Sequence, residues 1–214
     1  ESKVERLLGD IICSTGQPDH KLADQRFSEA ITRLGRAAKM PGGLIYRTQI
    51  AATVATAAAS HGLELQDPSE AVGKAYDTAL RKVYAGKQRQ PWMCVPMLET
   101  LVAQGHRLRR GWVTQCKCIK AYLQHLTAAP LPHHHGRAIY GHTRDNVCTW
   151  HGPISRLRNV FQDHGWQWQA HDRVTTEDGY ELDLNTDDHR WILHRVRASQ
   201  RRQAWLSVPR SRHD

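Results

Sequence analysis

Hydrophobic residues recur at helical spacing through the first half of the chain. Between Asp19 and Lys39, apolar side chains follow one another every three or four positions while arginines share the other flank, and this spacing predicts an amphipathic helix. The sequence Met40-Pro41-Gly42-Gly43 ends that helix, because proline cannot continue it and glycine permits a sharp turn. An alanine-rich second helix is expected from 44 to 61, with side chains so small that a neighbour can pack very close.

Three further helices are expected before residue 129. Asp67-Pro68 has the form of a helix cap followed by proline at the first helical position, so a helix is predicted over 71–84. Two more are predicted over 96–104 and 111–128. The first 128 residues are therefore expected to form a bundle of about five helices.

The pattern changes after residue 128. Positions 129–150 are rich in proline, glycine and histidine and lack periodicity, which is typical of a linker or a functional loop. We place the boundary between an N-terminal domain (1–128) and a C-terminal module (151–214) in this segment.

The last third alternates helical and strand patterns. A short helix over 154–164 precedes strands between 166 and 184, and Glu177-Asp178-Gly179 forms the turn of a β-hairpin. Asp187-Asp188 then caps a helix that runs to about 204. The predicted fold is mainly α: a helical bundle followed by a small α+β module with one β-hairpin. Of its tryptophans, Trp166, Trp191 and Trp205 are expected in the core, and Trp150 or Trp168 on the surface.

Charge is distributed unevenly along the chain. The formal net charge is +9, yet no acidic residue lies between Glu99 and Asp145, or between Arg190 and the final Asp214. Two such blocks favour nucleic acid as the partner, because arginine and lysine side chains release counterions from phosphate backbones; a solvated face that keeps the protein soluble is the alternative. The candidate phosphate ligands in these blocks are Arg107, Arg109, Arg110, Lys117, Lys120, Arg195, Arg197, Arg201 and Arg202.

A series of short motifs in residues 1–126 resembles the region that follows the palm in reverse transcriptases of non-LTR retroelements. The resemblance lies in the order of the motifs more than in any one of them. They are Leu7-Leu8-Gly9, a helix with Arg26, Arg33 and Arg36, the Pro41-Gly42-Gly43 break, Arg47 at the start of an alanine-rich helix, the segment Leu80 to Gly86, and the segment Cys94 to Arg107 that ends in Gly-His-Arg.

The resemblance implies a thumb and connection that hold template and primer, RNA or an RNA–DNA hybrid. Arg33, Arg36, Lys39 and Arg47 are then expected to contact backbone phosphates, which position the nucleic acid without reading its sequence. The catalytic aspartates of that family belong to a palm upstream, and no Tyr-x-Asp-Asp occurs here. We therefore expect no catalytic residue and no cofactor in this segment, and a palm domain of the parent chain as its partner.

Two other functions remain open. His134, His135, Cys148 and His151 could hold zinc or form a metal-dependent, HNH-like nuclease, since Cys148-x-x-His151 has the spacing of two zinc ligands. Against this, no second ligand pair stands at the usual interval, and Cys116 and Cys118 fall on different sides of a predicted helix. The other possibility is a structural RNA-binding or ribosome-associated protein.

Cysteine content and hydropathy indicate the compartment. Five cysteines without framework spacing predict reduced thiols in an intracellular setting, the nucleus or the cytoplasm. No stretch approaches the roughly 18 consecutive apolar residues of a membrane span, so we expect no membrane partner.

Overall fold

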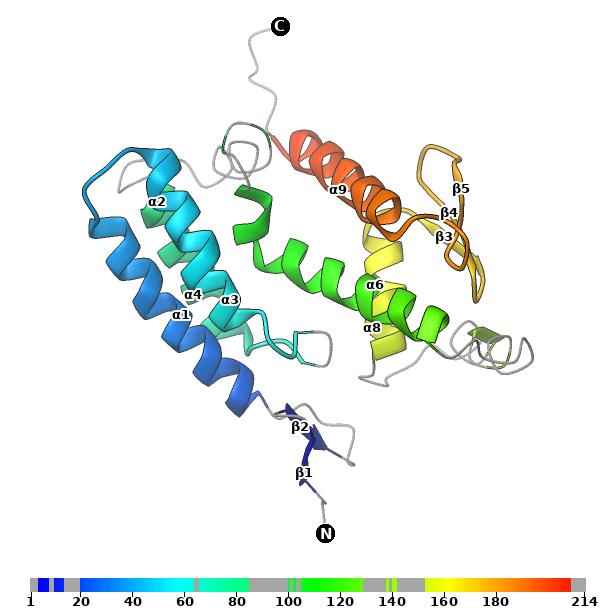
Figure 1. The fold of residues 1–214 in the computed structure, drawn as a ribbon, viewed down its shortest axis with the longest axis horizontal. Helices are drawn as coiled ribbons and strands as arrows, with labels where there is room; N and C mark the ends of the chain where they lie inside the picture. The colour runs from blue at the N-terminus through cyan, green and yellow to red at the C-terminus, as the bar shows by residue number, and fades with distance from the viewer. Residues whose placement is uncertain are drawn as a thin grey trace, which may run out of the picture.

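The computed structural model describes residues 4–7, 10–13, 20–63, 66–84, 105–128 and 153–208, together with positions 100, 102, 138, 140 and 141. Helices predominate among them, and a small antiparallel sheet lies in the last third (Figure 1). This confirms the expected class, a helical bundle followed by a small module with strands. Most of the predicted helix over 96–104 and of the loop over 129–150 falls outside the described residues.

A two-stranded hairpin opens the described chain. Strand β1 (Val4–Leu7) pairs antiparallel with β2 (Asp10–Cys13), so that Leu7 lies opposite Asp10. The hairpin lies apart from the second half of the molecule, beside the beginning of the first long helix (Figure 1).

Three helical rods follow the hairpin. Helix α1 (Lys21–Lys39) and helix α4 (Glu70–Tyr84) match the predicted ranges to within two residues. The second predicted helix is continuous from α2 (Leu44–Ile50) to α3 (Thr56–Ala59), but its middle, η1 (Ala51–Ala55), winds as a π-helix. Gly62 follows this rod with a φ of +73°, a conformation that glycine adopts without strain and that is common just after the end of a helix.

Small side chains let these rods pack closely. Ala51, Ala55 and Ala59 recur at intervals of four and are almost completely buried in the first core. Phe27 of α1 meets Tyr76 of α4 edge to face, with ring centroids 5.1 Å apart. These alanines therefore allow the close packing that the sequence predicts, because a helix without large side chains on one face permits close approach of its neighbour.

The second half is built around one long helix. The short 3-10 turn η3 (Gly105–Leu108) leads into α6 (Arg110–Ala128), and α8 (Pro153–Asp163) and α9 (His189–Leu206) pack against α6. Asp188 caps α9, as predicted, by accepting a hydrogen bond from the backbone N–H of Arg190 at 2.7 Å. None of the described helices is both long and apolar enough to cross a lipid bilayer.

Between α8 and α9 lies a three-stranded antiparallel sheet. Its order is β3 (Gln167–Ala170), β4 (Arg173–Thr175) and β5 (Glu181–Asp183). The predicted turn at Glu177-Asp178-Gly179 joins β4 to β5, and Gly179 there has a φ of +79°. A second turn, at His171-Asp172, adds the strand β3 that a single hairpin does not provide.

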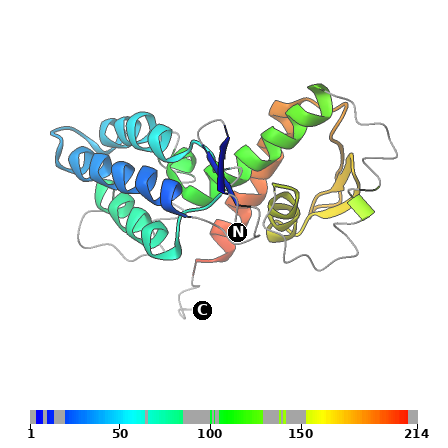
Figure 2. The same ribbon diagram turned by 90° about the horizontal axis from the view of Figure 1, so that it is seen from below.

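The two buried cores divide the chain earlier than the sequence indicates. The first core ends at Leu108, and the second begins at Trp112 and joins α6 to α8, the sheet and α9. Helix α6, which the sequence groups with residues 1–128, thus packs with the C-terminal module. Its position between the two halves is visible from below (Figure 2), and Val113 near its start contacts both cores.

Candidate nucleic-acid interface

The predicted phosphate ligands lie on several helices. Arg33, Arg36 and Lys39 are exposed on α1, and Arg47 is half-buried on α2. Arg33 donates a hydrogen bond of 3.1 Å to the carbonyl of Val54, so its guanidinium lies along the second helical rod. This group belongs to the first bundle.

Four of the predicted ligands are paired with carboxylates among the described residues. Arg33 lies 3.9 Å from Glu29 on α1. Arg110 lies 3.7 Å from Asp77 of α4. Arg195 binds both carboxylate oxygens of Asp178, and Arg202 lies 2.9 Å from Glu177. Because Glu177 and Asp178 form the β4–β5 turn, these two arginines tie α9 to the sheet, and their charges are locally balanced.

The charges of Arg107, Arg197 and Arg201 act on one buried histidine, and we call these three residues the arginine cluster. His106 of η3 is 6% exposed, and its ring meets Trp112 edge to face with centroids 5.0 Å apart. Burial, together with the neighbouring charges of Arg197, Arg107 and Arg201, lowers the pKa of His106 to about 4. The histidine is therefore neutral near pH 7, and the positive potential comes from the arginines alone.

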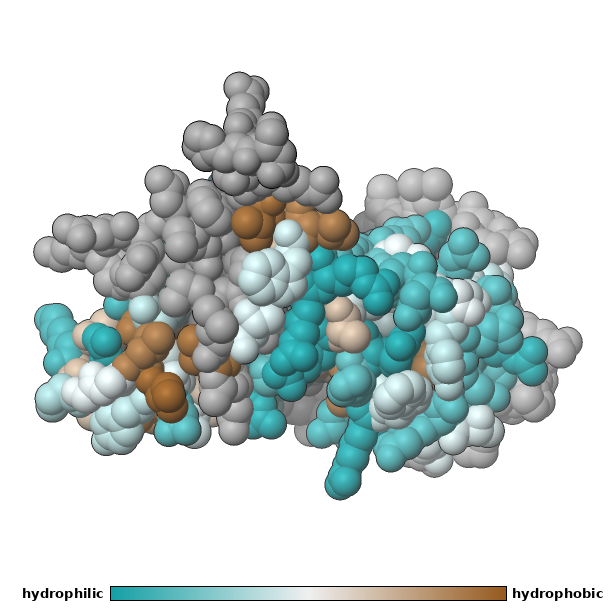
Figure 3. Space-filling model, turned by 90° about the horizontal axis from the view of Figure 1, so that it is seen from above, coloured by the Kyte–Doolittle hydropathy of each residue, from teal (hydrophilic) through white to brown (hydrophobic). Residues whose placement is uncertain are grey.

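The packing of α9 explains why its arginines reach η3. Ile192, Val196 and Ala204 are buried, and this face of α9 turns inward. Arg197 and Arg201 are one turn apart and share one flank of that face, since residues four apart lie above one another on a helix. In the described part of the chain no carboxylate lies within ion-pair distance of Arg201. From above, hydrophilic residues cover the middle of the molecule, where α9 lies (Figure 3).

The remaining candidates lie at other points of the second half. Arg109 precedes α6, and its charge contributes to the lowered pKa of His164, which burial reduces to about 4. Lys117 is half-buried and Lys120 exposed on α6. They extend the positive charge along the helix.

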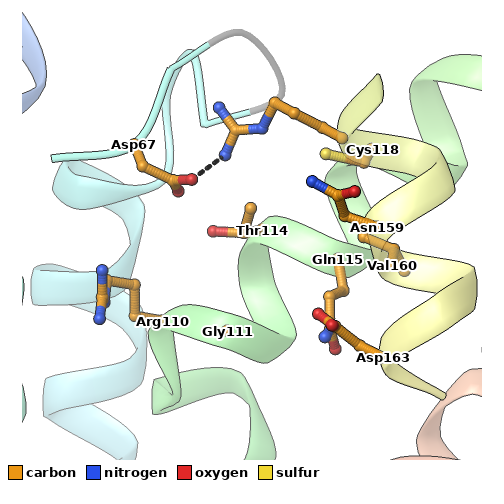
Figure 4. Close-up of a pocket in the computed structure, with 10 residues that line it drawn as sticks. Asp67, Arg110, Gly111, Thr114, Gln115, Cys118, Asn159, Val160 and Asp163 are labelled. Carbon is orange, nitrogen blue, oxygen red and sulfur yellow. Dashed lines mark ion pairs between the residues drawn. The ribbon is translucent and has the colours of Figure 1, made fainter. Parts of the chain in front are cut away.

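A cavity of about 330 Å³ lies between α6, α8 and the loop before α4 (Figure 4). Arg156 of α8 crosses it to form an ion pair of 2.6 Å with Asp67. The guanidinium of Arg110 lies on the opposite side, over Gly73, where a Cβ atom would stand 2.6 Å from its Nη1 atom. The other lining residues are Gly111, Thr114, Gln115, Cys118, Asn159, Val160 and Asp163.

The cavity offers hydrogen-bond donors and acceptors of both charges. Among the described residues that line it, the one thiol, that of Cys118, is buried in the wall. Burial raises the pKa of Asp163. The arrangement suits a small polar ligand.

The predicted metal ligands are not tested by the structure. His134, His135, Cys148 and His151 lie outside the described residues. Within the described part of the chain, no three potential ligands stand close enough to hold an ion. Cys116 and Cys118 lie on α6, one half-buried and one buried, as the helical spacing of the sequence indicates.

The tryptophans are distributed differently from the prediction. Trp166 is buried, as expected, but Trp191 and Trp205 are 41% and 52% exposed. Trp168 is half-buried between Tyr122 and Phe161, with ring centroids 6.0 and 5.6 Å away. The signal was present in the spacing, because the apolar positions Ile192, Val196 and Ala204 define a helical face to which neither exposed tryptophan belongs.

Comparison with known proteins gives no relative: no family model, no curated protein and no solved structure matches this chain. The charges, the rings and the cavity are the observations that bear on its function.

Proposed function

We propose that this chain binds nucleic acid, and that the arginine cluster is a principal phosphate contact. The observation that carries the proposal is that the charges of Arg107, from one acid-free block, and of Arg197 and Arg201, from the other, all act on the same buried histidine, His106. These residues lie far apart in the sequence.

The balance of charge around α9 supports a phosphate ligand. On one flank, Arg195 and Arg202 are matched by Asp178 and Glu177. On the other flank, no carboxylate among the described residues lies within ion-pair distance of Arg201. A phosphate backbone supplies an anion for such a side chain and releases counterions as it binds.

The wider proposal concerns the parent protein. The ordered motifs that resemble the region after a reverse-transcriptase palm support a thumb and connection that hold RNA or an RNA–DNA hybrid. In that setting Arg33, Arg36, Lys39 and Arg47 of the first bundle form a second contact with the backbone. The gene upstream of Glu1 tests this part: we expect a palm domain with catalytic aspartates, and an unrelated domain there would exclude it.

The binding proposal is tested by titration at several salt concentrations. The ligands are a single-stranded RNA, a duplex DNA and an RNA–DNA hybrid of equal length. The variant Arg107→Gln/Arg197→Gln/Arg201→Gln is compared with Lys74→Gln/Arg81→Gln/Lys82→Gln, which removes the same charge from exposed positions of α4. We expect the first variant to lower the slope of log affinity against log salt by about 2–3 for duplex ligands.

Two results would overturn the proposal. One is the absence of binding by the unaltered protein even at low salt. The other is an equal loss of affinity in both triple variants, because net charge rather than the arginine cluster would then determine binding. Circular dichroism of both variants verifies that the helices are intact.

A further inference from the structure

We propose that the exposed face of α9 stacks unpaired bases, so that the preferred ligand is a single-stranded nucleic acid or an unpaired segment of a longer one. The inference rests on the proposed nucleic-acid binding and names the form of ligand. It depends on a group of exposed rings, Tyr180, Trp191 and His194, which we call the aromatic ridge.

The rings of the aromatic ridge hold one another in fixed orientations. The imidazole of His194 lies parallel to the indole of Trp191, at an interplanar angle of 10° and a centroid distance of 5.5 Å. Tyr180, from the β4–β5 turn, meets Trp191 edge to face at 6.2 Å. Tyr180 and Trp191 nevertheless remain 45% and 41% exposed, so ring surface is presented to solvent in a pre-set position.

The guanidinium of Arg195 lies close to two rings of the aromatic ridge. Its guanidinium carbon lies 5.1 Å from the centre of the Tyr180 ring and 6.0 Å from that of Trp191. The same guanidinium is bound to both oxygens of Asp178. Because the sheet and the helix are joined through this residue, the rings have less freedom to lose when a ligand binds, and pre-organisation of this kind strengthens binding.

The ridge runs between two rows of arginines on α9. At about 100° per residue, Trp191 and His194 occupy the middle of the exposed face, opposite the buried Ile192 and Val196. Arg195 and Arg202 fall on one side of the rings. On the other side fall Arg190, Arg197 and Arg201, of which the last two belong to the arginine cluster.

Charge on the two sides differs in a way that orients a strand. Arg195 and Arg202 are matched by Asp178 and Glu177, so that side is nearly neutral and does not draw in the backbone. On the other side, no carboxylate among the described residues lies within ion-pair distance of Arg190 or Arg201. A strand whose phosphates follow that side directs its bases towards the rings, which is the arrangement found in sequence-tolerant single-strand binding.

The exposed ring face fits a base better than it fits a duplex. Every base has a flat π-surface that can stack on an aromatic ring, whereas in a duplex both faces of each base are already stacked. Duplexes are held mainly through their phosphates. Removal of the ridge should therefore affect unpaired ligands and spare paired ones.

The test compares Trp191→Ala with Tyr46→Ala, a variant of an exposed aromatic residue on α2, outside the ridge. The ligands are a twelve-nucleotide single-stranded DNA, the same strand with abasic sites throughout, and the corresponding duplex. We expect Trp191→Ala to weaken binding of the base-bearing single strand by about 5- to 150-fold. Binding of the abasic strand and of the duplex should change by less than about twofold, and Trp191→Phe should restore most of the affinity.

The outcomes separate this inference from the function on which it rests. If the protein binds no ligand at low salt, both are wrong. If it binds with a steep salt dependence but Trp191→Ala equals the unaltered protein on the base-bearing strand, only the aromatic ridge is wrong. Equal weakening on all three ligands also overturns the ridge, because an effect that ignores the bases cannot arise from stacking.

Discussion

The phenol of Tyr122 donates a hydrogen bond of 2.6 Å to the backbone carbonyl of His171. The bond joins the middle of α6 to the turn between β3 and β4, and both residues are buried. Burial also raises the pKa of the Tyr122 phenol, so its proton remains available to the carbonyl throughout the physiological range. This contact holds the sheet in register against the long helix.

Replacement of Tyr122 by phenylalanine should lower the free energy of unfolding by about 1–3 kcal/mol, because the buried carbonyl of His171 loses its donor. Urea denaturation measures the effect. Tyr46→Phe, at a site 52% exposed, serves as the control and should change stability by less than about 0.5 kcal/mol. Equal stability of the two variants would show that water replaces the lost donor.

Overpacking between α1 and the second rod should be equally costly. Ala55 is 1% exposed in the first core, and a leucine there forces the two helices apart, with an expected loss of about 1–3 kcal/mol. Ala57 lies on the exposed side of α3, so Ala57→Leu is the matched control. Thermal unfolding of the two variants compares them; a similar midpoint for both would mean that the helices separate freely.

Stability should fall on mild acidification. Burial lowers the pKa values of His106 and His164 to about 4, against about 6.5 in the unfolded chain. The unfolded state therefore binds protons more readily, and the stabilisation is complete above pH 6.5 and is lost as pH falls towards 4. Each histidine contributes up to about 3 kcal/mol to this dependence.

Denaturant titrations between pH 7.5 and 4.5 measure this pH dependence of the free energy of unfolding. The variant His106→Gln/His164→Gln should flatten the pH dependence, while His61→Gln, at an exposed site, should leave it unchanged. A profile that stays steep in the double variant would assign the acid sensitivity to other groups.

Removal of one carboxylate should strengthen nucleic-acid binding. Hydrogen bonds from Thr176 and then Arg195 hold the pKa of Asp178 down at about 2, so this carboxyl is charged at every pH used for binding. Asp178→Asn releases the charge of Arg195 on the side of α9 that is otherwise nearly neutral. For duplex ligands, which do not use the aromatic ridge, we expect a severalfold gain in affinity at low salt and a salt slope steeper by about one unit. An unchanged slope would place the bound strand away from Arg195.

The sequence predicts the positions of the helices well, but it predicts poorly which helices pack against one another. Apolar spacing located α1, α4, α8 and α9 because each buries a continuous face, and the spacing records that face directly. The apolar spacing could not show which of the two cores contains α6, since an apolar face does not indicate which neighbouring element packs against it. The extra strand β3 was missed for a related reason: its alternation was visible, but the short turn at His171-Asp172 lacks the glycine of the turn at 177–179.

The candidate site was predictable in composition and not in arrangement. Acid-free blocks identified Arg107, Arg197 and Arg201 as cations, but only folding shows that their charges act on the same residue, His106, and that Arg195 and Arg202 are matched by carboxylates. His106 was visible in the sequence only as part of the Gly-His-Arg motif, which gave it no role of its own. The exposure of Trp191 could have been predicted, because Ile192 and Val196 mark the buried face of the helix and Trp191 lies outside that face.

The passage from Leu108 to Trp112, where one core ends and the other begins, limits how this chain can be divided or inherited. A gene fusion that joins foreign sequence after residue 128 carries α6 away from the helices and sheet that cover it, and leaves its apolar face open to aggregation. A junction just before α6 keeps each core whole, although Val113 loses its contacts with the first. A recombination event that transfers the C-terminal module with its core intact must therefore fall within a few codons of this passage.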